Sequence, residues 1–206
     1  MAYPTVSKPY GFRPINLIGG QVFAGATRKM RIASGYDTSI GFGDLLIRVN
    51  DGTVARSTAT TAKPTGGFAG VFLGCEFVNS STGQVQFQQN FVADTTVTSG
   101  FITAYVCDDP DTLFQVTVVS GTTVITGVQF TSVGNNAEIV NNTGITAAGN
   151  SQVALLETTA TTDTFPIRIV DVVPDTAYVS GGNTLFPEVI VKFNFGMHAY
   201  DTALGV

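Results

Sequence analysis

A single histidine, two cysteines and one aspartate cluster are the residues whose chemistry could make a site in this sequence. General acid–base catalysis or metal binding at His198 would need carboxylates or thiolates around it. The adjoining sequence supplies only Asp201. We therefore expect His198 to be a structural or surface residue.

Three aspartates, Asp108, Asp109 and Asp111, surround Pro110. Carboxylates are ligands that Ca²⁺ prefers, but the spacing and terminal glutamate of an EF-hand are missing. Aspartate and proline are also the residues favoured at the first positions of a type I turn. The sequence favours a turn here, and a cation site is the alternative.

Both cysteines, Cys75 and Cys107, lie in apolar runs that read as strands. A free cysteine behaves as a small hydrophobic residue, and two cysteines without a framework of others are a poor signature of disulfide bonding. We expect two buried, reduced thiols. A disulfide between neighbouring strands is the alternative.

The sequence patterns of common catalytic sites are missing. There is no Gly-x-Ser-x-Gly elbow, no Walker-type phosphate loop and no glycine-rich dinucleotide fingerprint between a strand and a helix. Glu76 and Glu157 could in principle form a glycosidase pair, but sequence alone cannot place them face to face. We expect a non-catalytic protein with no cofactor, no metal and no small-molecule substrate.

The composition points to an all-β fold. Thr, Val and Ile account for 29, 25 and 12 of the 206 residues, and 23 glycines lie between them. β-Branched side chains fit the surface of a sheet and lose rotamer freedom in helices. Charged residues make up only 12% and the mean hydropathy is +0.27, which excludes disorder over most of the chain. The predicted architecture is a sandwich, jelly roll or barrel.

Short apolar runs alternate with turn residues from residue 21 to the end, which predicts one β-rich domain over 21–206. A seam near Asp108 is the alternative, and no internal repeat of fixed period is visible. Two windows, 151–158 and 133–140, have a helix-like composition. The predicted strands are 21–23, 28–32, 45–49, 70–77, 85–91, 101–107, 113–119, 123–131, 167–173 and 189–195.

The first twenty residues differ from the rest of the chain, because three prolines, Pro4, Pro9 and Pro14, recur at a spacing of five. Proline fixes φ and removes a backbone donor, so residues 1–20 are predicted to be an extended N-terminal arm. Its aromatic and basic side chains suit contact with a neighbouring subunit, and contact with its own domain is the alternative. The predicted partner-binding residues are Tyr3, Lys8, Tyr10, Phe12 and Arg13.

The net charge of −5 is unevenly distributed. Residues 1–63 carry eight basic and three acidic side chains, whereas the rest carries two basic and twelve acidic ones. A sequence pI near 4.6 argues against nucleic acid as the partner. The excess of basic residues in 1–63, which we call the basic front, suits contact with an acidic protein surface. The alternative is that the charged side chains of the two parts of the chain intermix on the folded surface. No stretch could form a membrane helix or the core of a signal peptide, so we expect a soluble, non-secreted protein without a membrane partner.

Several segments along nearly the whole chain resemble virion structural proteins of tailed bacteriophages. They combine turn and strand signatures without catalytic chemistry. The segments are 10–15 with Gly19-Gly20, 32–40 followed by Gly43-Asp44, 70–75, 104–110, 133–137, 149–151 and 193–198. Within that group the chain resembles capsid decoration, or cement, proteins.

The resemblance implies a β-rich, homotrimeric protein that is made in the host cytoplasm and sits on the outer capsid surface of the virion. There it would bridge neighbouring major capsid protein subunits and stabilise the head against the pressure of packaged DNA. Another β-rich phage component, such as a tail-tube, neck or connector protein, is the alternative. The major capsid protein itself is disfavoured, because no stretch has the period of a long spine helix.

Overall fold

The computed structural model describes residues 8–98, 100–120, 130–177, 186–203 and 205, and nearly all of its regular structure is β. The described part holds one 3₁₀ turn, η1 (Phe130–Ser132), and one four-residue helix, α1 (Pro174–Ala177). None of its helices is long and apolar enough to span a membrane. The strands are β1 (Arg13–Leu17), β2 (Arg28–Ile32), β3 (Leu45–Arg48), β4 (Val54–Arg56), β5 (Phe68–Val78), β6 (Val85–Gln88), β7 (Ile102–Cys107), β8 (Thr112–Val119), β9 (Asn136–Val140), β10 (Ala154–Ala160), β11 (Ile167–Val172) and β12 (Glu188–Phe193).

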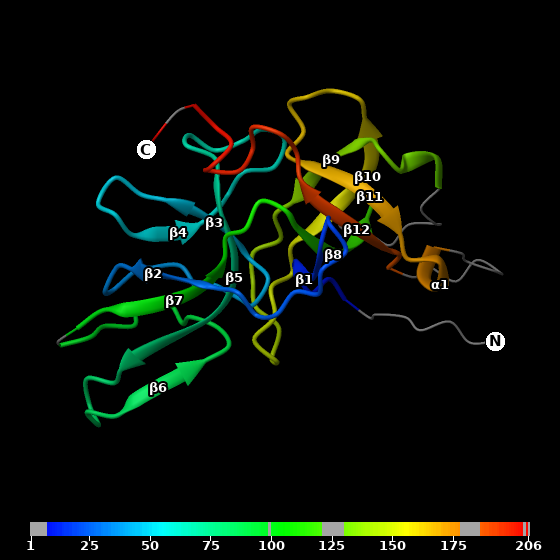
Figure 1. The fold of residues 1–206 in the computed structure, drawn as a ribbon. Helices are drawn as coiled ribbons and strands as arrows, with labels where there is room; N and C mark the ends of the chain where they lie inside the picture. Colours follow the sequence, from blue (N-terminus) through cyan, green and yellow to red (C-terminus); the bar gives the residue numbers. More distant parts are fainter. Residues whose placement is uncertain (1–7, 99, 121–129, 178–185, 204, 206) are drawn as a thin grey trace.

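Strands β2 to β7 form the lobe on the left of Figure 1, which we call the first barrel. Its sheet closes on itself in the order β2-β4-β3-β5-β7-β2, and β6 extends it as a hairpin with β5. The β2–β4 contact is parallel and consists of the single pair Ile32↔Val54, whereas the other pairings are antiparallel. Buried apolar side chains such as Leu46, Phe72 and Ile102 fill the interior.

Strands β8 to β12 form the second barrel, which repeats the topology of the first. Its sheet closes in the order β8-β10-β9-β11-β12-β8, with one parallel contact between β8 and β10 and antiparallel pairings elsewhere. In each barrel the first strand therefore pairs in parallel with the third and antiparallel with the fifth. The boundary between the two barrels falls at 108–111, where the sequence showed a possible seam. The predicted β domain over 21–206 thus contains two barrels of one topology.

The all-β prediction is confirmed, and most strand positions agree with the sequence. The bounds of β2 match the prediction residue for residue, and those of β7, β8, β11 and β12 agree closely. The two helix-like windows are wrong, because they contain the strands β10 and β9. The predicted strand 21–23 is reduced to a single bridge between Val22 and Asn16, flanked by backbone hydrogen bonds of Gln21 and Phe23 to β1. Most of the strand predicted at 123–131 lies outside the described residues.

The N-terminal segment belongs to the second barrel from residue 10 onward. Strand β1 pairs antiparallel with the first half of β8, with a register shift between Pro14 and Asn16. Phe12 is fully buried and packs edge-on against Phe114, with 6.1 Å between ring centroids. The predicted boundary at residue 20 therefore does not separate an arm from the β domain. Proline is tolerated here because β1 lies at the edge of its sheet.

A polar cluster and a close backbone crossing join the two barrels. Asp44, in the loop before β3, accepts hydrogen bonds from the Ser151 hydroxyl (2.6 Å) and the Gly41 amide (2.7 Å), and pairs with Arg56 at 3.1 Å. Gly43 adopts a φ of +90°, and a Cβ there would lie 2.8 Å from the Phe12 nitrogen. A side chain at position 43 would therefore push the N-terminal segment away.

His198 is a structural residue, as predicted. It is fully buried between Phe193 and Tyr200, with ring centroids 5.3 and 5.1 Å away. Its Nδ1 accepts a hydrogen bond from the Tyr200 amide at 3.3 Å, whereas its Nε2 has no partner among the described residues. Burial lowers the pKa of this imidazole, although Asp201 and Asp108 oppose the shift.

This burial predicts a loss of stability on mild acidification. The unfolded chain protonates His198 near its ordinary pKa of about 6.5, whereas the folded chain holds it neutral to lower pH. The contribution of neutral His198 to the free energy of unfolding is therefore fully present above pH 6.5. It is lost as the pH falls from there through the lowered pKa of the folded state. Urea unfolding at pH 7 and pH 5 measures it. The His198→Gln variant should show a smaller decrease than wild type, and an equal decrease would contradict the assignment.

Candidate partner-binding groove

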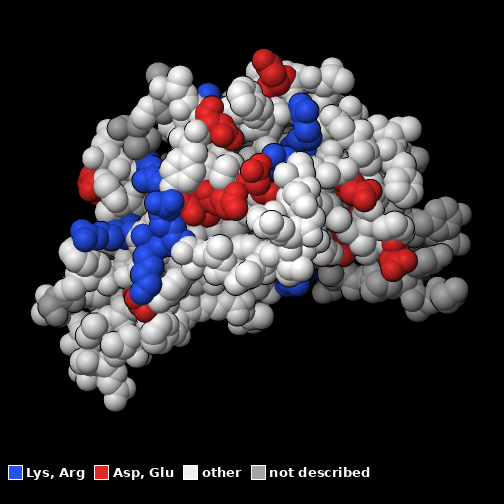
Figure 2. All heavy atoms as spheres, in the orientation of Figure 1, with Lys and Arg blue, Asp and Glu red and all other residues white. Residues whose placement is uncertain are grey.

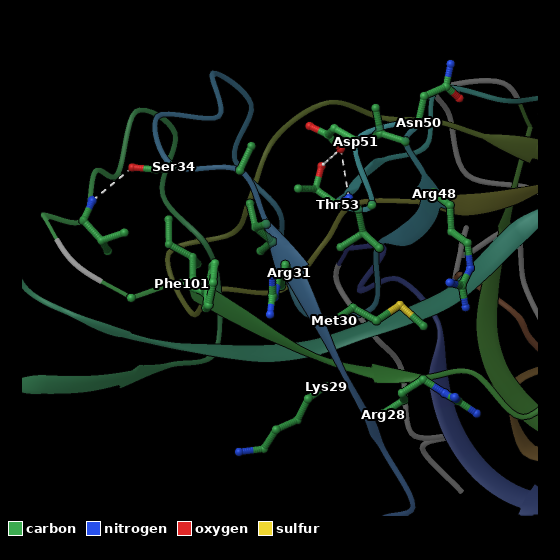
Figure 3. Close-up of a pocket in the computed structure, with 18 residues that line it drawn as sticks. Arg28, Lys29, Met30, Arg31, Ser34, Arg48, Asn50, Asp51, Thr53 and Phe101 are labelled. Carbon is green, nitrogen blue, oxygen red and sulfur yellow. Dashed lines mark hydrogen bonds between the residues drawn. The ribbon is translucent and has the colours of Figure 1, made fainter.

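A groove of about 720 Å³ runs along the outside of the first barrel, between β2, the β3–β4 hairpin and the segment before β7 (Figure 3). Its charged and aromatic lining side chains come from all three elements. They are Arg28, Lys29, Arg31, Arg48, Asp51 and Phe101. We call it the basic groove.

The basic groove follows an open edge of strand β2. Every residue from Arg28 to Ser34 lines it, although successive side chains of a strand point to opposite faces. On this edge β2 pairs with β4 only at Ile32↔Val54, and no described strand pairs with residues 28–31 there. The groove is thus the gap left where β2 and the β3–β4 hairpin diverge.

Two of the four cations are already paired with carboxylates. Arg28 donates a short hydrogen bond to Asp108, and Lys29 lies 3.1 Å from Glu76. These contacts raise the pKa values of Arg28 and Lys29, so both side chains stay charged. Asp51 is held within its own turn by Thr53, whose hydroxyl and amide lower the pKa of the carboxyl.

The other two cations rest on aromatic rings. The Arg31 guanidinium lies 3.6 Å from the ring centroid of Phe101, and Arg48 donates a hydrogen bond to the Tyr200 hydroxyl at 3.0 Å. Neither arginine pairs with a carboxylate of a described residue. Ring contacts orient a guanidinium and leave its charge unneutralised, so Arg31 and Arg48 are available to an anionic partner.

The unequal charge distribution along the sequence persists in space. Figure 2 shows Lys and Arg gathered over the first barrel with carboxylates beside them, whereas separate carboxylates are scattered over the otherwise mostly uncharged face of the second barrel. Four of the eight basic residues predicted as a basic front line the groove. The others do not join it, and Arg56 is buried against Asp44.

Large apolar side chains are exposed both in the basic groove and elsewhere on the surface. Phe101 is 59% exposed, and Phe87 on the edge strand β6 is 71% exposed. Phe195, after β12, is 88% exposed. Large apolar side chains of this kind are enriched where proteins contact other proteins.

The predicted partner-binding residues do not form one site. Phe12 is buried in the core, and buried Tyr10 donates a short hydrogen bond to Glu188. Desolvation, together with this hydrogen bond, raises the pKa of the Tyr10 hydroxyl. Both side chains therefore stabilise their own chain and are not free to anchor a neighbour. Arg13 is exposed above the Tyr10 ring at 4.1 Å, and Lys8 is exposed. Tyr3 lies outside the described residues.

The two cysteines and the aspartates around Pro110 were the other candidate site residues in the sequence. Cys75 and Cys107 are free and buried in different cores, as predicted, and burial raises the pKa of Cys75 to about 11. The predicted turn is present at 109–112, because the Thr112 amide donates to the Asp109 carbonyl at 3.1 Å and the Asp109 carboxylate accepts the Asp111 amide at 2.9 Å. Across the described ranges no three metal-ligating side chains gather.

The sequence contained one signal for the groove, the run Arg28-Lys29-Met30-Arg31 within a predicted strand. What brings Arg48 and Phe101 beside it is the pairing of β2 with β7 and the divergence of the β3–β4 hairpin. No family model matches this chain, and no curated protein or solved structure is significantly similar to it.

Proposed function

We propose that this chain is a non-catalytic capsid decoration protein that binds the outer surface of a phage head. It bridges neighbouring major capsid protein subunits, as a homotrimer. The observation that carries the proposal is the basic groove, with its unpaired arginines, on a chain of net charge −5. Such a local reversal of charge suits attachment to an acidic protein surface, because electrostatic complementarity directs association and excludes wrong partners.

The proposed mechanism is stabilisation by binding. A protein that binds the assembled shell and not its separated subunits favours the shell by mass action. Each bridge adds polar contacts through the groove and apolar contacts through exposed residues such as Phe101. The joint between two subunits then opens less readily under the pressure of the packaged DNA.

Reversing the charge of the two available arginines tests this attachment. The double variant Arg31→Glu/Arg48→Glu should bind particles stripped of the protein at least tenfold more weakly, about 1.4 kcal/mol. Sedimentation of labelled protein with the particles measures the affinity. The control is Arg168→Glu, an exposed arginine on β11 of the second barrel, which should change the affinity less than twofold. Equal affinities of the double variant and wild type would contradict the role of the groove.

The location on the particle has its own test. A decoration protein should be present in hundreds of copies, close to the number of major capsid protein subunits, and stripped heads should release DNA at a lower temperature. A few copies in a sixfold ring would place the protein in the tail instead. Unchanged DNA release after stripping would remove the cementing role.

A further inference from the structure

The repeated topology gives the open edge of β2 a counterpart in the second barrel. Strand β2 of the first barrel corresponds to β8 of the second, since each is the first strand of its ring. On one edge β8 pairs with β12, and on the other it pairs with β10 through Val118 and Val119. The remainder of that second edge, from Thr112 to Gln115, pairs with β1.

In the first barrel the corresponding edge is the basic groove. Strand β2 pairs with β7 on one side and with β4 through Ile32 on the other, and residues 28–31 are left open. The groove therefore occupies the place that β1 fills in the second barrel. Its open edge of four residues is about 13 Å long at 3.3 Å per residue, which is enough for one short strand.

We infer that the basic groove accepts an extended acidic segment of a neighbouring shell protein as an added β-strand, antiparallel to β2. The inference rests on the proposed function, because it assigns the way in which the groove attaches the protein to the shell. Main-chain hydrogen bonds to the edge of β2 supply affinity in this mode, and side chains on alternate positions supply specificity.

The charges of the groove select the segment. Arg31 lies on β2 without a carboxylate partner among the described residues, so a carboxylate at the facing position of an added strand would pair with it. Arg48 approaches from the β3–β4 hairpin on the other side. A nucleic acid fits less well, because Asp51 lines the groove, two cations are already paired, and the whole chain is acidic.

Synthetic peptides test the inference on the full-length protein. The probe is an eight-residue peptide of alternating valine and aspartate, compared with one in which lysine replaces aspartate. Two further versions carry N-methyl groups on all valines or on all aspartates, and each blocks a different edge of the strand. We expect the acidic peptide to bind, the lysine peptide not to bind, and one of the two methylated versions to bind at least tenfold more weakly.

Protein variants and an oligonucleotide complete the test. Arg31→Glu/Arg48→Glu should lose at least tenfold in peptide affinity, and Arg168→Glu less than twofold, with near-identical circular dichroism spectra. Equal binding of both methylated peptides would overturn strand addition, and so would an octathymidylate that displaces the acidic peptide. Peptide binding without particle binding would refute the proposed function alone. Particle binding that depends on Arg31 and Arg48, without selectivity between the methylated peptides, would refute strand addition alone.

Discussion

Replacing Asp44 by alanine is expected to lower the free energy of unfolding by about 3–5 kcal/mol. The carboxylate is 1% exposed, and its partner Arg56 has a side chain that is 5% exposed. Burial raises the pKa of Asp44, so Arg56, Ser151 and the Gly41 amide are needed to stabilise its ionised form. Without the carboxylate, the Arg56 guanidinium is a buried charge whose hydrogen-bond partners in the described part of the chain are Asn141 and the Asn142 carbonyl.

Urea unfolding at pH 7 measures the effect. The matched control is Asp37→Ala, an exposed aspartate that accepts a hydrogen bond from Thr38 and should change stability by no more than about 0.5 kcal/mol. The double variant Asp44→Ala/Arg56→Met should be more stable than Asp44→Ala, because it removes the uncompensated charge. A loss below about 1 kcal/mol for Asp44→Ala would contradict the stabilising role that we assign to this buried ion pair.

Replacing Phe12 by alanine should cost about 3–5 kcal/mol, because a fully buried phenylalanine leaves a cavity when it is truncated. The ring packs against Phe114, and the Phe12 amide donates to the Gly43 carbonyl at 2.9 Å. Thermal unfolding followed by circular dichroism measures the loss. The neighbouring exposed residue supplies the control, since Arg13→Ala removes only a contact with the Tyr10 ring.

A truncation separates the two roles that the N-terminal segment could have. An intersubunit arm would leave a folded protein after deletion of residues 1–14, whereas the burial of Tyr10 and Phe12 predicts severe destabilisation. Deletion of residues 1–7 instead leaves β1 and both aromatic residues in place. A 1–14 deletion that unfolds at the wild-type temperature would contradict the part that we assign to Phe12.

Local sequence pattern identified most strands, because β-branched runs between turn residues need little information from the rest of the chain. It failed at β10, where Ala154, Leu155 and Glu157 are good helix formers. The strand forms because β10 has partners on both of its edges, β9 and β8, and tertiary pairing overrides propensity. Because these partner strands lie elsewhere in the sequence, the pairing cannot be recognised from the residues of β10 alone.

The candidate site was less predictable than the fold. Aromatic residues beside prolines indicate that a segment is buried, but residue type does not reveal whether its own domain or a partner covers it. This is why Phe12 and Tyr10 were expected to contact a neighbour. The basic groove exists because β2 and β4 pair only at Ile32↔Val54 and separate on either side of this pair. Nothing in the local sequence indicates that the pairing is so short.

The pairing of β1 with β8 also sets the order in which the protein can fold during synthesis. Arg13 pairs with Gln115, so β1 cannot join the sheet of the second barrel until about a hundred further residues have been added, roughly 5–20 s at typical rates of translation. All strands of the first barrel lie between Arg28 and Cys107, and this barrel can close in that time. Until the second barrel begins to form, β1 must therefore wait with its local bridge to Val22 and without its partner β8.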